Sequence, residues 1–63
     1  MKVYAVIQCT AFAGNPIAIK SSKAKAIACI KAFEGVTVKN SDWIGGVAIP
    51  EDGTCKIVTY HVS

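Results

Sequence analysis

One stretch of the sequence, residues 20–34 (KSSKAKAIACIKAFE), has the pattern of an amphipathic α-helix and constrains what the remaining residues can form. Ser21 or Ser22 is expected to cap its N-terminus, and Gly35 follows its C-terminus, where glycine takes positive φ without a steric cost. At 3.6 residues per turn the larger apolar side chains fall on one side, with Ile27 at the edge of a stripe formed by Ala26, Cys29, Ile30 and Phe33. The sequence therefore predicts one helix with one buried face.

The segments flanking this helix are rich in β-branched residues and are separated by turn signals. The predicted strands are residues 2–10, 17–19, 36–39, 43–49 and 54–62. Turns containing Gly, Asn, Asp or Pro are predicted at residues 11–16, 40–42 and 50–53, and the Gly45-Gly46 pair suggests a bulge. We predict an α+β fold in one domain, residues 1–63: a small antiparallel β-sheet of four to five strands, in the order β-β-α-β-β-β, with the helix packed on one face.

A sheet covered by a single helix leaves its other face open to water or to a partner. The first strand is apolar on nearly both sides, so we expect it to be a central strand, with Tyr4, Val6 and Gln8 on the open face. On the last strand, alternation leaves two sets of residues for that face, either Val58, Tyr60 and Val62 or Ile57, Thr59 and His61. Phe12, in the first turn, is expected to be a lid on the helix or an exposed anchor, the lid being favoured.

The composition indicates a chain with more apolar side chains than it can bury. It has 63 residues, of which 52% are hydrophobic, so we expect an exposed apolar patch that favours a protein partner or a homodimer. The three cysteines are an odd number without a disulfide framework, which is typical of reduced thiols in the cytoplasm. No secretory signal is recognisable, and no apolar run approaches the roughly 20 residues that span a bilayer, so no membrane association is expected.

Charge is unevenly distributed along the chain, although the net charge is only +3. Residues 1–33 contain five lysines and no acid, whereas the remaining residues contain four acids and two lysines. Lys20, Lys23 and Lys25 lie near the helix N-terminus, where backbone N–H groups favour anions. This end could receive a phosphate or a carboxylate, or the lysines could simply be solvated. Arginine is absent, which weakens a nucleic-acid interpretation.

A stripe of small residues marks the outward side of the helix. Ala24, Ala28 and Ala32 are spaced four apart, where a polar face is expected. Small side chains permit the close approach of a partner, but alanine is also the strongest helix former. Both interpretations stay open.

Catalytic and metal-binding patterns are weak in this sequence. His61 is the only histidine, and Cys9, Cys29 and Cys55 lack the close spacing of a structural zinc site. Glu51 and Asp52 are adjacent in a predicted turn and are expected to point apart. We therefore predict a protein that is not an enzyme, with no catalytic residues, no metal site and no cofactor.

Three segments resemble a broad group of small phage and bacterial proteins of unknown function. They are MKVYAV at the start, IAIKSSKAKAIACIKAF through the helix, and CKIVTYHV near the end. The resemblance implies a hairpin, a helix and a closing strand, in a mobile-element accessory protein of a kind that sometimes inhibits host machinery. This chain departs from the pattern at Ala24 and Ile27, where such helices tend to carry acids, and residues 37–52 look like an added segment.

Two functional hypotheses follow. The first is a small binding protein, in its most concrete form an anti-defence or host-takeover inhibitor or accessory factor of a phage or other mobile element, acting in the host cytosol on a protein or a protein–nucleic-acid complex. The alternative is a small basic protein that binds nucleic acid directly through the lysine cluster, with aromatic side chains available for stacking. The predicted partner-binding residues are Lys20, Lys23, Lys25, Tyr4, Phe12, Trp43 and Tyr60.

Overall fold

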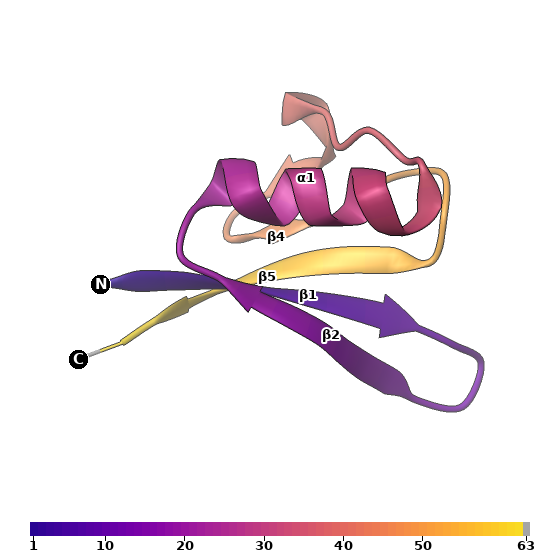
Figure 1. Cartoon of the computed structure of the whole chain (residues 1–63), viewed down its shortest axis with the longest axis horizontal. Helices are drawn as coiled ribbons and strands as arrows, with labels where there is room; N and C mark the ends of the chain where they lie inside the picture. Colours follow the sequence, from indigo (N-terminus) through magenta and orange to yellow (C-terminus); the bar gives the residue numbers. More distant parts are fainter. Residues whose placement is uncertain (63) are drawn as a thin grey trace.

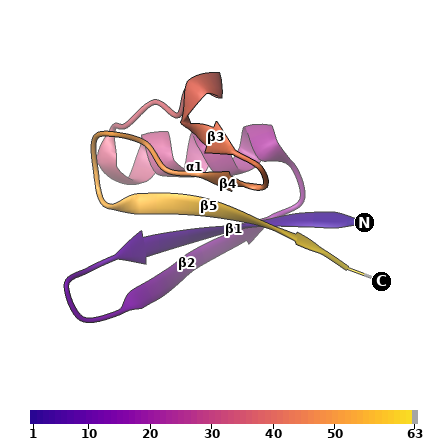
Figure 2. The ribbon, with the colours of Figure 1, turned by 180° about the vertical axis from the view of Figure 1, so that it is seen from behind.

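The computed structural model describes residues 1–62 as one five-stranded antiparallel sheet and one α-helix. The regular elements are β1 (Lys2–Cys9), β2 (Gly14–Lys20), α1 (Lys23–Glu34), a 3-10 turn (Asn40–Asp42), β3 (Trp43–Ile44), β4 (Val47–Ala48) and β5 (Cys55–His61). Figure 1 shows α1 lying across one side of the sheet, and Figure 2 shows the short β3–β4 hairpin beside it. The predicted α+β class, with one helix on one face of the sheet, is confirmed.

The strands lie in the order β2-β1-β5-β4-β3, so that β5, the last strand in the chain, occupies the centre of the sheet. The strand β1, predicted to be central, pairs with β2 on one side and with β5 on the other, so it lies inside the sheet but next to the central strand. The two ends of the chain meet beside these strands, where the backbone N–H of Val62 donates to the carbonyl oxygen of Met1 at 2.8 Å. The two edge positions of the sheet are β2 and β3.

The core lies between α1 and the sheet. Val6, Ile30 and Ile57 are the largest fully buried side chains, and they come from β1, α1 and β5. Around them pack the smaller buried residues Ala26, Val38, Ala48 and Cys55. Burying each large aliphatic side chain contributes about 1.5–3 kcal/mol, so this small cluster accounts for much of what holds the helix to the sheet.

The two ends of α1 have the expected caps. Ser22 has extended backbone angles, and its Oγ accepts a hydrogen bond from the backbone N–H of Lys25 at 3.2 Å. Gly35 has φ of 72°, and its N–H donates to the carbonyl oxygen of Lys31 at 2.9 Å. Of the two serines predicted as caps, Ser22 is the one used.

Residues 36–39, predicted as a strand, are not one, and this prediction was wrong. The segment runs from the end of α1 to the 3-10 turn without joining the sheet, although it buries Val38 in the core. The strand predicted over residues 43–49 is instead a hairpin, in which Gly45 and Gly46 form the turn between β3 and β4. Gly45 has φ of 63°, which suits the two-residue turns that join antiparallel strands.

The strand β2 begins earlier than the sequence indicates. Pro16 was expected to end strand pairing, yet it pairs with Ile7 beside an irregularity in the register between Val6 and Ile7. Proline is compatible with this position because β2 is an edge strand, so its missing N–H removes no interior hydrogen bond.

The face of the sheet expected to be open is the covered one, and this assignment is corrected. Val6 and Ile57 pack under α1 with Tyr4 beside them, so alternation places Val3, Ala5 and Ile7 on the opposite face. The earlier assignment failed because β1 is apolar on both sides and its pattern alone does not reveal the covered side. For β5, the set containing Val58 and Tyr60 is the one on the open face.

Two aromatic side chains are more exposed than expected. Phe33 is 50% exposed rather than part of the core stripe, and Phe12 is 99% exposed at the tip of the β1–β2 hairpin rather than a lid on the helix. Figure 1 shows this hairpin diverging from the C-terminal end of α1. The right-handed twist of sheets accounts for this divergence, which leaves Phe33 at the rim and carries Phe12 away from the helix.

With 12 residues, α1 is too short to cross a bilayer, and no helix within residues 1–62 has the length and apolar character that a membrane span requires.

Candidate functional site

The open face of the sheet is an apolar surface with one charge in it. Strand pairing and alternation place twelve residues there, hereafter the open face: Val3, Ala5, Ile7, Cys9, Gly14, Pro16, Ile19, Ile44, Val47, Lys56, Val58 and Tyr60. Ile19 is 69% exposed, Ile44 is 76% exposed and Tyr60 is 51% exposed. No acidic residue belongs to this set.

The total accessible surface is slightly larger than expected for a chain of this mass, as one uncovered face of the sheet would make it. The accessible surface is 4197 Å², whereas a folded monomer of 6.6 kDa is expected to expose roughly 3,900 Å². From the strand rise and spacing, the open face spans about 20 Å across its five strands and about 20–25 Å along β1 and β5, but only about 7 Å along β3 and β4. A surface of this extent is at the lower end of those that bind another protein specifically.

A polar cleft lies on the covered side, beyond the N-terminal end of α1. It has a volume of about 270 Å³, and four segments line it: the start of β1, the start of α1, the β3–β4 hairpin and the end of β5. Its lining residues, hereafter the basic cleft, are Lys2, Tyr4, Lys23, Trp43, Gly45, Gly46, Thr59 and His61. The set combines three nitrogen-bearing basic side chains with two hydroxyl groups and contains no acid.

Trp43 forms one wall of this cleft and is half-buried against the core. The ammonium nitrogen of Lys23 lies 4.4 Å from the centroid of its ring, which is a cation–π geometry. The indole N–H is buried and has no acceptor among the described residues. Packing and the lysine contact, rather than an indole hydrogen bond, therefore determine where Trp43 lies.

A shallower groove runs along α1 on the side facing β2. Lys20 and Lys25 line it together with Ala28, Cys29, Ala32 and Phe33. Two of the three stripe alanines thus line a groove, while Ala24 is exposed outside it. The predicted lysine cluster is accordingly divided, because Lys23 belongs to the basic cleft and the other two lysines to this groove.

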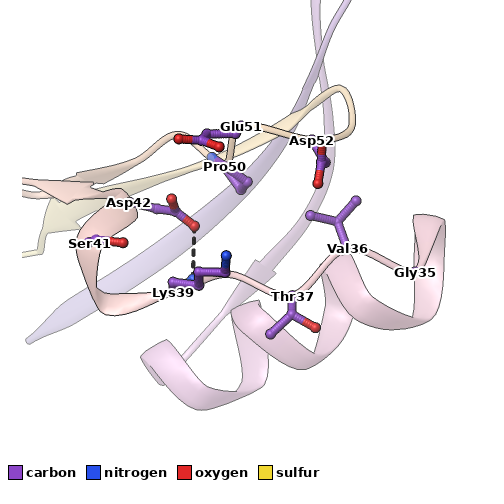
Figure 3. Close-up of a pocket in the computed structure, with 9 residues that line it drawn as sticks. All are labelled: Gly35, Val36, Thr37, Lys39, Ser41, Asp42, Pro50, Glu51 and Asp52. Atoms are coloured by element: carbon purple, nitrogen blue, oxygen red, sulfur yellow. Dashed lines mark hydrogen bonds between the residues drawn. The ribbon is translucent and has the colours of Figure 1, made fainter.

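Three of the acidic residues line a separate pocket, formed by the segment after α1 and the turn before β5. Asp42, Glu51 and Asp52 line a pocket of about 380 Å³ with Lys39, and Figure 3 shows the carboxylates of Glu51 and Asp52 pointing in different directions. Asp42 accepts a hydrogen bond from the backbone N–H of Lys39 at 2.8 Å, drawn as a dashed line in Figure 3. This carboxylate therefore holds the 3-10 turn in place.

Glu34, the last residue of α1, links the helix to the start of β5 through hydrogen bonds. Its carboxylate accepts from the backbone N–H of Thr54 at 3.0 and 3.1 Å, from the Thr54 hydroxyl at 3.0 Å and from the backbone N–H of Cys55 at 3.2 Å. Burial acts to raise the pKa of Glu34, but these hydrogen bonds outweigh it and the pKa lies below its ordinary value. Burial, followed by the Glu34 charge, raises the pKa of the Cys55 thiol.

The structure brings together only some of the predicted partner-binding residues. Tyr4, Lys23 and Trp43 meet in the basic cleft, whereas Tyr60 lies on the open face and Phe12 at the hairpin tip. Sequence reasoning missed Lys2, Thr59 and His61 as cleft residues. These residues come together because β1 and β5 pair in a register that sets Lys2 opposite His61 and Tyr4 opposite Thr59. A single sequence gives no direct signal of that register.

The described part of the chain contains no cluster of metal-ligating side chains. Within residues 1–62, no three His, Cys, Asp or Glu side chains are grouped closely enough to hold a metal ion. Cys9 is exposed, Cys29 is half-buried and Cys55 is buried, and each is a free thiol.

Comparison with known proteins gives no relative for this chain. No protein-family model matches it, and neither the curated proteins nor the solved structures contain a match. The resemblance to small phage and bacterial proteins therefore stays a prediction. The structure defines the chain as a small α+β domain. Its exposed surfaces are the features that bear on its function.

Proposed function

We propose that this protein is a small non-catalytic binding domain that uses the open face of its sheet to dock onto another protein. The observation that carries the proposal is the exposure of Ile19, Ile44 and Tyr60 on one continuous apolar surface. Contiguous apolar surface is unusual on a monomeric protein and marks sites of interaction. Tyrosine in such a surface is typical of interface cores.

Charge favours a different protein over a second copy as the partner. Lys56 lies within the open face, on the central strand, and the face contains no carboxylate to pair with it. A symmetric dimer through this face would bring two lysines into an apolar interface without a counter-charge, which is costly. We therefore infer a partner whose apolar patch contains a carboxylate positioned for Lys56.

The inhibitor hypothesis is the most concrete form of this proposal. An accessory protein of a phage or other mobile element would dock its open face onto a component of the host machinery in the host cytosol. The support is the resemblance of the first strand, the helix and the last strand to such proteins, together with an apolar surface able to cover a partner's site.

Nucleic-acid binding is the second candidate, and the basic end of the molecule favours it. Lys20, Lys23 and Lys25 surround the start of α1, and no acid lines either of the two surfaces to which they belong. Against this candidate, the helix divides the three lysines between two surfaces. A backbone binder of this kind would lose affinity steeply as salt rises.

The test is affinity capture from a lysate of the source host, with and without nuclease, followed by identification of the bound proteins. The bait variants are a double change on the open face, Ile19→Ser with Ile44→Ser, and a matched control of exposed residues elsewhere, Phe12→Ser with Phe33→Ser. A third bait replaces Lys20, Lys23 and Lys25 with glutamine.

The expected result is a protein that survives nuclease treatment, binds wild type and the control alike, and is lost at least tenfold with the open-face variant. Direct titration of the purified partner should reproduce that loss. Equal capture by the open-face variant would contradict the proposal. Loss of all bound material after nuclease, together with loss in the glutamine variant, would establish the nucleic-acid candidate instead.

A further inference from the structure

The basic cleft has the composition of an anion site that no part of the proposed protein-docking function uses. It lies on the covered side of the sheet, whereas the open face is on the other side. Lys2, Lys23 and His61 line it from three different elements, and the hydroxyl groups of Tyr4 and Thr59 add donors. We propose that this cleft binds a phosphate group, either as free phosphate or on a small organic phosphate.

The placement of charge in the molecule supports an anionic ligand. Asp42, Glu51 and Asp52 line a different pocket, and the Glu34 carboxylate is occupied by Thr54 and Cys55. The basic cleft therefore has no carboxylate of its own among the described residues. Two lysines and a histidine line the cleft without a counter-charge in its lining, and the lysine charges create a positive potential that favours an anion.

The shape of the cleft supports a small ligand. Its volume of about 270 Å³ lies just below the roughly 300–1,000 Å³ of sites for drug-sized molecules. Glycines form the hairpin side, and a Cβ added at Gly45 would meet nothing within 4 Å, so the backbone is open to a ligand there. A phosphate together with a small attached group fits these dimensions.

The ammonium group of Lys23 is positioned so that it can contact a phosphate in the cleft. The Trp43 ring lies under its ammonium group at 4.4 Å, which restricts the lysine while leaving donors directed away from the ring. The Gly46 carbonyl accepts from the Thr59 backbone N–H at 2.8 Å, which fixes the hairpin against β5. The cleft is therefore formed by paired strands and a packed aromatic side chain rather than by loose loops.

Trp43 is the only tryptophan in the sequence, so its fluorescence reports directly on the cleft. The experiment titrates the full chain at constant ionic strength with inorganic phosphate, with a nucleoside monophosphate and with the same nucleoside lacking phosphate. The expected result is a saturable change for both phosphate-bearing probes, with Kd of about 1 mM or below, and none for the nucleoside. Tighter binding of the monophosphate would identify an organic phosphate, and equal binding would identify free phosphate.

Matched lysine variants locate the site. Lys2→Gln removes a cleft cation, and Lys39→Gln makes the same charge change in the pocket that Asp42, Glu51 and Asp52 line. Loss of a charge-assisted contact should weaken phosphate binding about tenfold for Lys2→Gln, and less than about twofold for Lys39→Gln because salt screens distant charges. Both residues are exposed, so both variants should fold.

Three results would overturn the proposal: no saturable change with either phosphate probe, equal weakening by the two variants, or binding of the nucleoside as tight as that of its monophosphate. None of these depends on whether the open face binds a protein. The failure of this inference and the failure of the docking proposal are therefore distinguishable.

Discussion

Both faces of the sheet carry large aliphatic side chains, but only one face lies under α1. Ile57, on the face under α1, has no exposed surface, while Ile44, on the other face, is 76% exposed. Both are isoleucines in strands of the same sheet, but Ile57 is on the central strand under α1, whereas Ile44 is on the edge strand β3 and faces away from the helix. The comparison teaches that a small chain with apolar residues on both faces of its strands has enough helix to cover one face and leaves the other exposed.

The largest expected effect is the difference between matched isoleucine substitutions on the two faces. Ile57→Ala should lower the free energy of unfolding by about 2–5 kcal/mol, because it opens a cavity beneath α1. Ile44→Ala should change it by only about 0.5 kcal/mol, because the side chain is already in contact with water. Urea denaturation of both variants measures the difference, and similar losses would mean that the open face is covered in solution.

A second prediction concerns the connection that holds α1 over its face of the sheet. Gly53 has φ of 83°, and a Cβ there would collide with the Glu34 carboxylate and with Val36, whereas one at Gly35 would meet nothing within 4 Å. Gly35→Ala should therefore cost about 1 kcal/mol for its positive φ alone. Gly53→Ala should cost about 2–3 kcal/mol, because the crowding adds to the backbone strain. Thermal unfolding of the two variants measures which substitution costs more stability. Equal costs would contradict the collision expected for a Cβ at residue 53.

A smaller, pH-dependent effect is expected at Glu34. Its pKa is lowered in the folded state from a usual 4.5, so its hydrogen bonds stabilise the fold above about pH 4.5 and are lost as the pH falls through the folded value. Glu34→Gln should be less stable than wild type at neutral pH, and the difference should disappear in acid. Denaturation curves at pH 7 and at pH 3 measure this. A difference that persists undiminished at the lower pH would show that charge is not involved.

Local signals predicted much of the fold. The spacing of Ala26 and Ile30, the hydroxyl of Ser22 and the freedom of Gly35 each act within one or two turns of helix, so their outcome can be read from neighbouring residues. The strand predictions succeeded where β-branched runs were long, in β1 and β5. They failed at residues 36–39 and 43–49, where short segments are decided by what they pack against.

The candidate sites were much harder to predict. Tyr4 and Trp43 were identified as binding residues for their aromatic character, yet they lie in a cleft on the covered side rather than on the open face. The open face itself was predicted to exist but was assigned the wrong residues of β1. A hydrophobic pattern reports that a strand has two apolar sides, but does not report on which side a helix will cross.

The sequence by itself determined the helix, its caps, the apolar strands and the unequal distribution of charge, because these depend on residues close together in the chain. Only the tertiary structure decided which face α1 covers, that Lys23 lies over Trp43, and that Glu34 reaches Thr54. These contacts join residues about 20 positions apart, through strand register and the path of the chain. Their energies come from packing and hydrogen bonds that exist only after the chain has folded.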